Sequence, residues 1–268
     1  MTTRRVNKPL GNRYAVLIER VFCDRYTPGA SEVLFRREHL TETARSLGVT
    51  LPKNLGDVIY SMRYRAFLPE AITRTQPEGK EWVIEGRGRS EYAFRLVTIS
   101  RIVPNKNLAP IKIPDATPEI VGAYALSDEQ ALLAKVRYNR LLDIFLGVAA
   151  YSLQNHLRTT VPKLGQVEID EIYVAIDRRG RQYVLPVQAK GGTDQLSSVQ
   201  TNQDIACCAA KFPGLVCRAI SAQFISEDLI ALFELGVCDE GVRIIEEKHY
   251  RLVPADQITA DDLRSYDQ

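Results

Sequence analysis

The chain lacks any apolar run of about 18 residues, the least that a transmembrane helix needs. Its first residues also lack the apolar stretch of a secretory signal peptide. With 45% hydrophobic and 25% charged residues among 268, the composition is ordinary for a globular protein. We therefore expect no membrane partner, and the default expectation is a cytoplasmic location.

Cysteine and histidine are scarce and irregularly spaced. The five cysteines are odd in number and include no Cys-x-x-Cys pair, so neither a disulfide framework nor a zinc site is expected. Cys207 and Cys208 lie in an apolar stretch, which predicts small core residues. The three histidines are scattered, and we expect none of them to be a ligand or catalytic base.

A strong net charge is also missing, but the small surplus of +2 is unevenly distributed. Residues 1–100 hold 17 Lys and Arg against 11 Asp and Glu, whereas residues 101–268 hold 18 against 22. A basic first part with an acidic remainder fits a nucleic-acid-binding part joined to another part. The same surplus is also compatible with a plain solvated surface.

The first 100 residues show helix, helix and hairpin patterns. Residues 36–47 have apolar positions at helical spacing and end at Gly48, and a second helix is expected from near Pro52 through Phe67. Residues 82–97 alternate around a basic Gly-Arg tip, which predicts a hairpin. Together these patterns predict a winged-helix-like DNA-binding domain over residues 1–100. The alternative is a small α+β lobe that packs on the rest.

A winged helix would place its second helix in the major groove and its hairpin along phosphates. The DNA-binding candidates are therefore polar and basic residues of these two elements. In the second helix they are Lys53, Asn54, Arg63 and Arg65, and in the hairpin they are Arg87 and Arg89.

The remainder of the chain predicts a mixed sheet flanked by helices, an α/β (α+β) fold. Residues 101–126 are rich in Pro and Asn and are interpreted as a linker, with the second domain at 127–268. A long helix is expected at 128–155, with Asp128 and Glu129 in its first turn. The elements expected after it are strands at 166–176 and 182–189, a helix at 194–211, a strand at 215–224, a helix at 226–235 and a strand at 242–252.

The first two of these strands carry the residues with chemical potential. Because side chains alternate faces along a strand, Asp170 shares its face with Glu168, whereas Glu171 points the other way. Gln188 and Lys190 also share a face, and a suitable register would bring them beside Asp170. An acid, an amide oxygen and an ammonium would then converge at the end of a hairpin.

Phosphodiester hydrolysis requires such a set of groups. A carboxylate binds Mg²⁺, which prefers oxygen ligands, and the ion polarises the phosphoryl group and activates a water. A lysine can orient that water and stabilise the developing charge. Gln188 stands where a second carboxylate is usual, so the site has one fewer negative charge. The alternative is that these are ordinary surface residues of a two-stranded edge.

The pattern of Gly165 to Asp170, a β-turn and then Gln188-Ala189-Lys190 resembles the PD-(D/E)XK nuclease superfamily, in the Gln-x-Lys variant of Mrr-type restriction endonucleases. The resemblance covers residues 128–224. It implies an α-β-β-β-α-β core with a mixed sheet and Mg²⁺-dependent DNA cleavage, with Mn²⁺ as an alternative ion.

The resemblance also assigns roles to individual residues. Asp170, Gln188 and Ala189 would form the metal site, and Lys190 would be the catalytic lysine. Glu168 is the candidate for the missing carboxylate. Gln200 in the following helix, like Gln195, corresponds to a glutamine that touches the site or the DNA in this superfamily.

The leading hypothesis is a sequence-specific restriction endonuclease acting on double-stranded DNA as a homodimer, since one site cuts one strand. A second hypothesis is a repair or recombination nuclease of the same superfamily that recognises DNA shape. A non-enzymatic alternative is a DNA-binding regulator with a degenerate nuclease domain. The recognition sequence and the dependence on methylation do not follow from the sequence.

Overall fold

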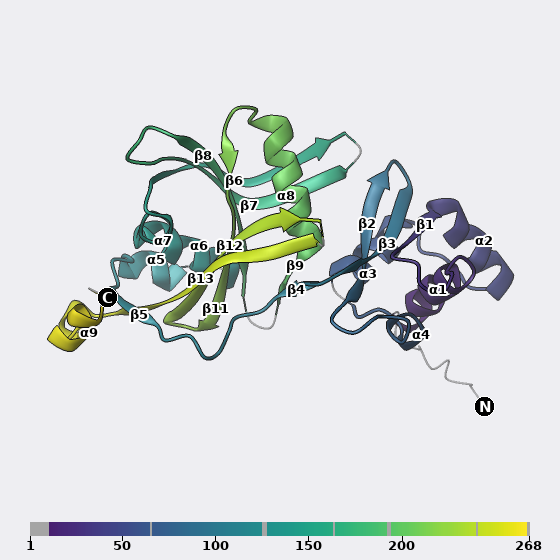
Figure 1. The fold of residues 1–268 in the computed structure, drawn as a ribbon, viewed down its shortest axis with the longest axis horizontal. Coiled ribbons are helices and arrows are strands. Elements are labelled where there is room, and N and C mark those ends of the chain that lie inside the picture. Colours follow the sequence, from purple (N-terminus) through teal and green to yellow (C-terminus); the bar gives the residue numbers. More distant parts are fainter. Residues whose placement is uncertain are drawn as a thin grey trace. The chain divides into compact units, whose positions relative to one another are not determined.

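The computed structural model describes residues 11–64, 66–124, 128–162, 164–191, 194–239 and 241–266. They form two compact units, each described below by itself (Figure 1). The first unit comprises Met1–Ser100 with Pro162–Gly165, and the second comprises Arg101–Val161 with Gln166–Gln268. Within the described ranges, no helix is long and apolar enough to cross a membrane.

The first unit combines a three-stranded antiparallel sheet with helices. Its strands lie in the order β1–β3–β2, and β3 pairs antiparallel with both neighbours. In chain order the elements are α1 (Gly11–Cys23), β1 (Glu32–Arg36), α2 (Arg37–Leu47), α3 (Gly56–Tyr64), α4 (Glu70–Thr73), β2 (Glu81–Gly88) and β3 (Glu91–Val97).

Aromatic rings form the centre of the core of the first unit. Phe22 on α1 meets Trp82 and Phe94 edge-on, with ring centroids 5.2 and 5.0 Å apart. Edge-to-face pairs of this kind add about 0.5–1.5 kcal/mol to the stabilisation from area burial. Because the three rings come from α1, β2 and β3, they fix the helix on the sheet.

Two of the predicted elements of the first unit are confirmed. The helix predicted at 36–47 is α2, which ends at Gly48 in the left-handed conformation with φ 62°. The hairpin predicted at 82–97 is β2–β3. The second predicted helix is shorter than expected, because α3 begins at Gly56 and the backbone from Pro52 to that residue is not helical.

The second unit is built on a long mixed sheet, as the sequence predicted. Its strand order is β5–β13–β12–β11–β8–β7–β6, and the pairs β8–β11 and β13–β5 are parallel. The strands are β5 (Ile111–Pro114), β6 (Ala149–Val161), β7 (Gly165–Ile176), β8 (Gln182–Lys190), β11 (Ala219–Ser226), β12 (Leu229–Cys238) and β13 (Gly241–Val253). Short strands are β4 (Arg101–Ile102), which pairs with β9 (Leu196–Ser197), and β10 (Val216–Cys217), which pairs with β8.

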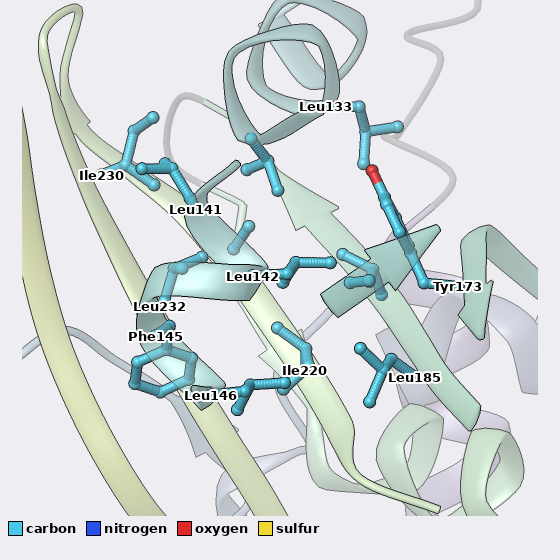
Figure 2. Packing of buried hydrophobic residues seen from close by; sticks show 14 of the residues in the cluster. Leu133, Leu141, Leu142, Phe145, Leu146, Tyr173, Leu185, Ile220, Ile230 and Leu232 are labelled. Atoms are coloured by element: carbon cyan, nitrogen blue, oxygen red, sulfur yellow. The ribbon is translucent and has the colours of Figure 1, made fainter. Parts of the chain in front are cut away.

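Helices cover both faces of this sheet. The helices of this unit are α5 (Glu119–Tyr124), α6 (Asp128–Tyr138), α7 (Leu141–Leu146), α8 (Ser198–Lys211) and α9 (Ala260–Ser265), and those on the faces are α6, α7 and α8. Leu185 and Val187 of β8 pack into the cluster formed with α6 and α7 (Figure 2). Gln188, one position further, contacts Asp204 on α8. Since neighbouring strand residues face opposite sides, α8 covers the face opposite α6 and α7.

The prediction of one long helix at 128–155 is wrong. The segment contains α6, α7 and the strand β6, with Arg140 at φ 51° between the helices and Gly147 at φ 65° after α7. In the sequence, the apolar residues Leu141, Phe145 and Val148 continue the helical spacing of α6. The spacing therefore gives no sign of the helix breaks at Arg140 and Gly147. In addition, β6 is an edge strand with most side chains exposed on both faces, so it lacks the alternation that predicts a strand.

The helix expected at 226–235 is also wrong, because this segment is the strand β12. It pairs antiparallel with β11 on one side and β13 on the other. Residues 230–235 are all buried. A continuous apolar run of this length fits a buried strand as well as a buried helix, and only the strand neighbours distinguish them.

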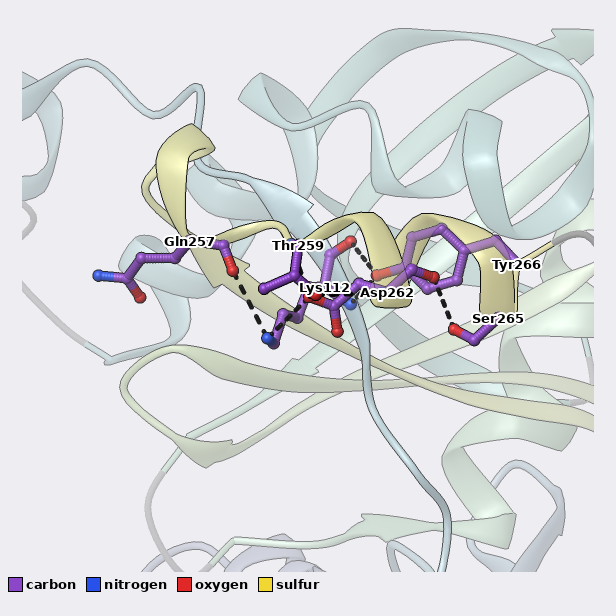
Figure 3. A network of polar contacts seen from close by, with 6 residues as sticks. All are labelled: Lys112, Gln257, Thr259, Asp262, Ser265 and Tyr266. Carbon is purple, nitrogen blue, oxygen red and sulfur yellow. Dashed lines mark hydrogen bonds and ion pairs between the residues drawn. The ribbon is translucent and has the colours of Figure 1, made fainter.

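Residues 101–126, interpreted as a linker, belong to the second unit, where β5 pairs with β13. Lys112 on β5 is bound by the last helix, with Nζ 3.0 Å from the Asp262 carboxylate (Figure 3). The Tyr266 hydroxyl accepts from the Lys112 amide and donates to its carbonyl, both at 3.0 Å. The edge of the sheet is therefore covered by the end of the chain.

Candidate active site

Asp170 lies at the end of the backbone hydrogen-bond ladder between β7 and β8. The two strands pair in register up to Glu171 and Val187. Beyond that pair, the backbone amide of Ala189 donates to Oδ2 of Asp170 at 2.8 Å. The Asp170 side chain thus takes the place of a backbone acceptor, which holds its carboxylate at the end of the hairpin.

Gln188 lies beside Asp170 and is almost fully buried. Its Nε2 donates to the backbone carbonyl of Glu168 at 2.9 Å and lies 3.2 and 3.1 Å from the two carboxylate oxygens of Asp204. A backbone carbonyl can only accept a hydrogen bond, so the amide nitrogen must face Glu168. The carbonyl oxygen of Gln188 is therefore turned away from both partners.

Asp204 on α8 is a buried acid that the sequence analysis did not single out. Burial raises the pKa of its carboxyl well above the ordinary value, and Asp170 raises it further, against the hydrogen bond from Gln188. A helical aspartate among apolar and small residues gives no signal of this contact in the sequence. Only the packing of α8 on β8 brings it to Gln188.

Lys190 is the cation of the site. Its Nζ lies 3.4 Å from Oε1 of Glu129, and its side chain is only 14% exposed. Glu129 comes from the first turn of α6, where the sequence suggested only an acid at a helix start. The two residues are 61 positions apart, so no local spacing could have joined them.

The pKa of the Asp170 carboxyl is raised from its ordinary value. Burial is the largest cause, and Glu129 raises it further. The Ala189 amide, Lys190 and His156 act in the opposite direction. Asp170 is thus a desolvated acid surrounded by charges of both signs, an arrangement that is more frequent at functional sites than elsewhere.

Glu168 and Glu171 have different surroundings, as face alternation predicted. Glu171 is completely buried toward α6, with Oε1 2.7 Å from the Arg137 guanidinium. Glu168 is partly exposed and lies close to two basic side chains of β6, His156 at 3.1 Å and Arg158 at 3.7 Å. Glu168 therefore remains a candidate helper carboxylate, with its side chain held by β6.

Gln200 has a local structural role. It forms a capping box with Ser197 at the start of α8, in which the Ser197 amide donates to its Oε1 at 3.4 Å and the Ser197 hydroxyl accepts from the Val199 amide. Such a cap satisfies amides at the helix start that would otherwise be unpaired. Gln195 is exposed in the segment before α8.

The donor set suits a hard divalent ion in its chemistry. Oxygen donors are present in Asp170, in the Gln188 carbonyl and in the backbone carbonyl of Ala189, and Mg²⁺ takes few protein carboxylates and keeps several waters. Glu129 is a further carboxylate near Asp170. In the part of the chain that the structure describes, no group of three or more His, Cys, Asp or Glu is arranged to hold a metal.

Two of the polar DNA-binding candidates in the first unit stabilise local structure. Nε of Arg63 donates to the backbone carbonyl of Ile84 on β2 at 3.0 Å. Asn54 accepts from the Gly56 amide at 3.0 Å and donates to the Asp57 carboxylate at 2.8 Å, at the start of α3. These bonds fix α3 and its approach.

The remaining candidates of the first unit differ in exposure and pairing. Arg87 forms ion pairs with Glu32 and, at 3.6 Å, with Glu85. Lys53 and Arg89 are exposed, at the start of α3 and at the hairpin tip. Arg65 lies outside the described residues.

No protein-family model, curated protein or solved structure matches the chain. The function is therefore inferred from the side chains at the end of the β7–β8 hairpin and from the topology of each unit.

Proposed function

We propose that this chain is a divalent-metal-dependent endodeoxyribonuclease related to the PD-(D/E)XK superfamily, in its Gln-x-Lys variant. The observation that carries the proposal is the meeting of a desolvated acid, a glutamine amide and a lysine at the end of one hairpin. These are the groups that metal-assisted phosphodiester hydrolysis uses.

The order of elements in the second unit supports the proposal. Two helices, α6 and α7, precede the neighbouring strands β6, β7 and β8, and α8 then leads to β11. The strand β11 runs parallel to β8, so α8 is a crossover connection. This order corresponds to the α-β-β-β-α-β core that the resemblance implies.

Each residue of the site has a distinct role in the proposed reaction. Asp170, the Gln188 carbonyl and the Ala189 carbonyl would hold the divalent ion, which would polarise the phosphoryl group when bound. Lys190 orients the attacking water and stabilises the negative charge that develops on the phosphoryl oxygens. Glu129 holds the ammonium of Lys190 close to Asp170.

The topology of the first unit supports DNA recognition. Helices α1, α2 and α3 accompany a sheet in which β3 lies between β1 and β2, and the β2–β3 hairpin carries Arg89 at its tip. In a winged helix, α3 would enter the major groove, while Lys53 and Arg89 would contact phosphates. Sequence-specific cleavage of both strands by a homodimer, as in a restriction endonuclease, is the function that combines the two units.

The proposal is tested by incubating phage DNA with the protein and Mg²⁺ or Mn²⁺. We expect discrete fragments from the parent and none from Lys190→Ala, whose rate should fall at least about 100-fold. Lys211→Ala, which removes an exposed lysine at the end of α8, is the matched control and should cut normally. DNA that stays intact with either ion, in methylated and unmethylated form, would overturn the proposal.

One observation favours a second candidate, a DNA-binding regulator with a degenerate nuclease unit. Gln188 occupies the position where the superfamily usually has an acid, and its amide nitrogen is engaged by Asp204. This candidate predicts specific DNA binding that survives Asp170→Ala, with no cleavage by the parent. Isothermal titration that detects no Mg²⁺ or Mn²⁺ binding, with or without DNA, would favour it.

A further inference from the structure

The amide of Gln188 and the carboxyl of Asp204 form a buried hydrogen-bonded pair. The amide nitrogen lies 3.2 and 3.1 Å from the two carboxylate oxygens. Gln188 is 2% exposed and Asp204 is 3% exposed. The pair connects α8 to the end of β8, directly beside Asp170.

Both members of the pair are buried, although one of them, Asp204, is ionisable. Burying a carboxyl group costs far more than burying an amide, because water stabilises the charged form. An arrangement that is unfavourable for folding at one place in a well-packed unit points to a functional requirement there.

The pair also fixes which atom of Gln188 faces the site. The Glu168 carbonyl requires the amide nitrogen on its side, and the Asp204 carboxylate accepts from the same nitrogen. Turning the amide over would bring its oxygen to 2.9 Å from another carbonyl oxygen, which is repulsive. The two acceptors together leave the Gln188 oxygen on the side away from the Glu168 carbonyl and the Asp204 carboxylate.

We propose that Asp204 is a positioning residue for Gln188. It holds the side-chain amide so that the oxygen of Gln188 faces Asp170. It also places a carboxyl group on the α8 side of Gln188, next to the position where the Gln-x-Lys pattern lacks an acid. The part that concerns metal binding rests on the proposed function, whereas the coupling of the two side chains does not.

The first experiment measures this coupling by thermal unfolding in EDTA, where no metal contributes. Gln188→Glu puts a second carboxylate against Asp204 and against the Glu168 carbonyl, so its Tm should fall by about 10 °C. Asp204→Asn removes a buried acid and should leave Tm unchanged or higher. The double variant, with the two groups exchanged, should recover at least half of the loss.

A matched control uses Gln223, another buried glutamine on the same face of the sheet. Its Nε2 also donates to a backbone carbonyl, that of Ile102, and to the Ser221 hydroxyl. Gln223→Glu should lose stability, and Asp204→Asn should not restore it. If Gln188→Glu does not fold alone, recovery of folded protein in the double variant counts as rescue. An additive loss in the double variant would overturn the coupling.

The second experiment measures Mn²⁺ binding to the folded variants by electron paramagnetic resonance of the free ion. Asp204→Asn should weaken Mn²⁺ binding about tenfold while its Tm does not fall, because the neutral amide oxygen of Asn holds the Gln188 amide less firmly than a carboxylate does. Unchanged affinity in Asp204→Asn would overturn the positioning role. If the parent binds no Mn²⁺, both the proposed function and the positioning role are wrong. The coupling between Gln188 and Asp204 is judged separately, by the unfolding experiment in EDTA.

Discussion

The two faces of the sheet in the second unit differ sharply in chemistry. The face under α6 and α7 is a continuous apolar cluster that includes Phe145, Leu185 and Ile220 (Figure 2). On the opposite face, Gln188 lies in register with Ser221 of the neighbouring strand, and both are buried. Alternating residues of the same strands therefore build two different interiors.

The polar face extends beyond the candidate site. Gln223 and His249 are buried on the same side of β11 and β13, each in register with Ala231 of the strand between them. His249 is 2.8 Å from the Glu247 carboxylate, and Gln223 donates to the Ile102 carbonyl at 3.1 Å. Buried polar groups are tolerated when they are hydrogen-bonded, but they contribute less net stability than apolar packing.

The two faces of the sheet therefore differ in role, because one stabilises the unit and the other carries the residues of the proposed function. Apolar packing under α6 and α7 stabilises the unit, whereas the α8 face keeps desolvated acids such as Asp170 and Asp204. Substitutions on the first face should therefore lower stability strongly. Substitutions on the second face that neutralise an acid should change binding or cleavage with little loss of stability, or even with a gain.

The largest expected effect lies on the apolar face. Phe145→Ala should lower the free energy of unfolding by about 4 kcal/mol, because a buried ring is replaced by a cavity. Ile144→Ala, at a half-exposed neighbour on the same helix, should cost less than about 1 kcal/mol. Urea denaturation measures both, and equal losses would contradict the assignment of this face to stability.

The next effect concerns the ion pair between Arg137 and Glu171 on the apolar face. Glu171 is completely buried, and Arg137 donates two hydrogen bonds to its Oε1. Arg137→Met should cost about 3 kcal/mol, because it leaves a buried carboxylate without its cation. Arg140→Met, at a mostly exposed arginine, is the control. The Ser152 hydroxyl also donates to Oε1 of Glu171, and a loss below about 1 kcal/mol would show that this bond alone satisfies the carboxylate.

On the polar face, replacing the acid Asp170 by a neutral residue should raise the free energy of unfolding instead of lowering it. Because the pKa of Asp170 is raised above 3.8, the folded protein binds this proton more tightly than the unfolded chain. Stability is therefore lost as pH rises from 3.8 through the raised pKa. In EDTA, Asp170→Asn should be about 1 kcal/mol more stable than the parent at pH 7. The difference should shrink toward pH 4, and a pH-independent difference would contradict this cause.

The smallest expected change in stability is at Glu129, which is 43% exposed. Glu129→Gln should change the free energy of unfolding by less than about 0.5 kcal/mol, since exposed ion pairs contribute little. Cleavage of DNA should nevertheless fall about tenfold, because Lys190 loses the charge that positions it. Glu119→Gln on α5, an exposed acid, should leave both quantities unchanged. Equal cleavage by both variants would remove Glu129 from the site.

Local patterns in the sequence were sufficient for several elements. The strands predicted at 166–176 and 182–189 are β7 and β8, because alternation and a turn at residues 177–180 are both encoded locally. Cys207 and Cys208 are buried, as their apolar surroundings indicated. The helix 194–211 begins later, at Ser198, because Leu196 and Ser197 form β9 and the capping box follows.

Contacts between distant segments could not be predicted in the same way. The strand β12 looks like a helix until its two neighbours are known, and β6 has no alternation because most of its side chains are exposed on both faces. At the candidate site, Asp170, Gln188 and Lys190 come from one hairpin and share a local pattern. Glu129 and Asp204 come from helices on either side of the sheet.

The sequence by itself determined the mixed α/β composition, the hairpin with Asp170 and Lys190, and the opposite orientations of Glu168 and Glu171, because strand periodicity is a local property of the backbone. Only the tertiary structure decided that Asp204 lies behind Gln188 and that Glu129 meets Lys190. Those contacts depend on how helices dock on a sheet, which is set by the packing of many side chains together and is not encoded by any single spacing.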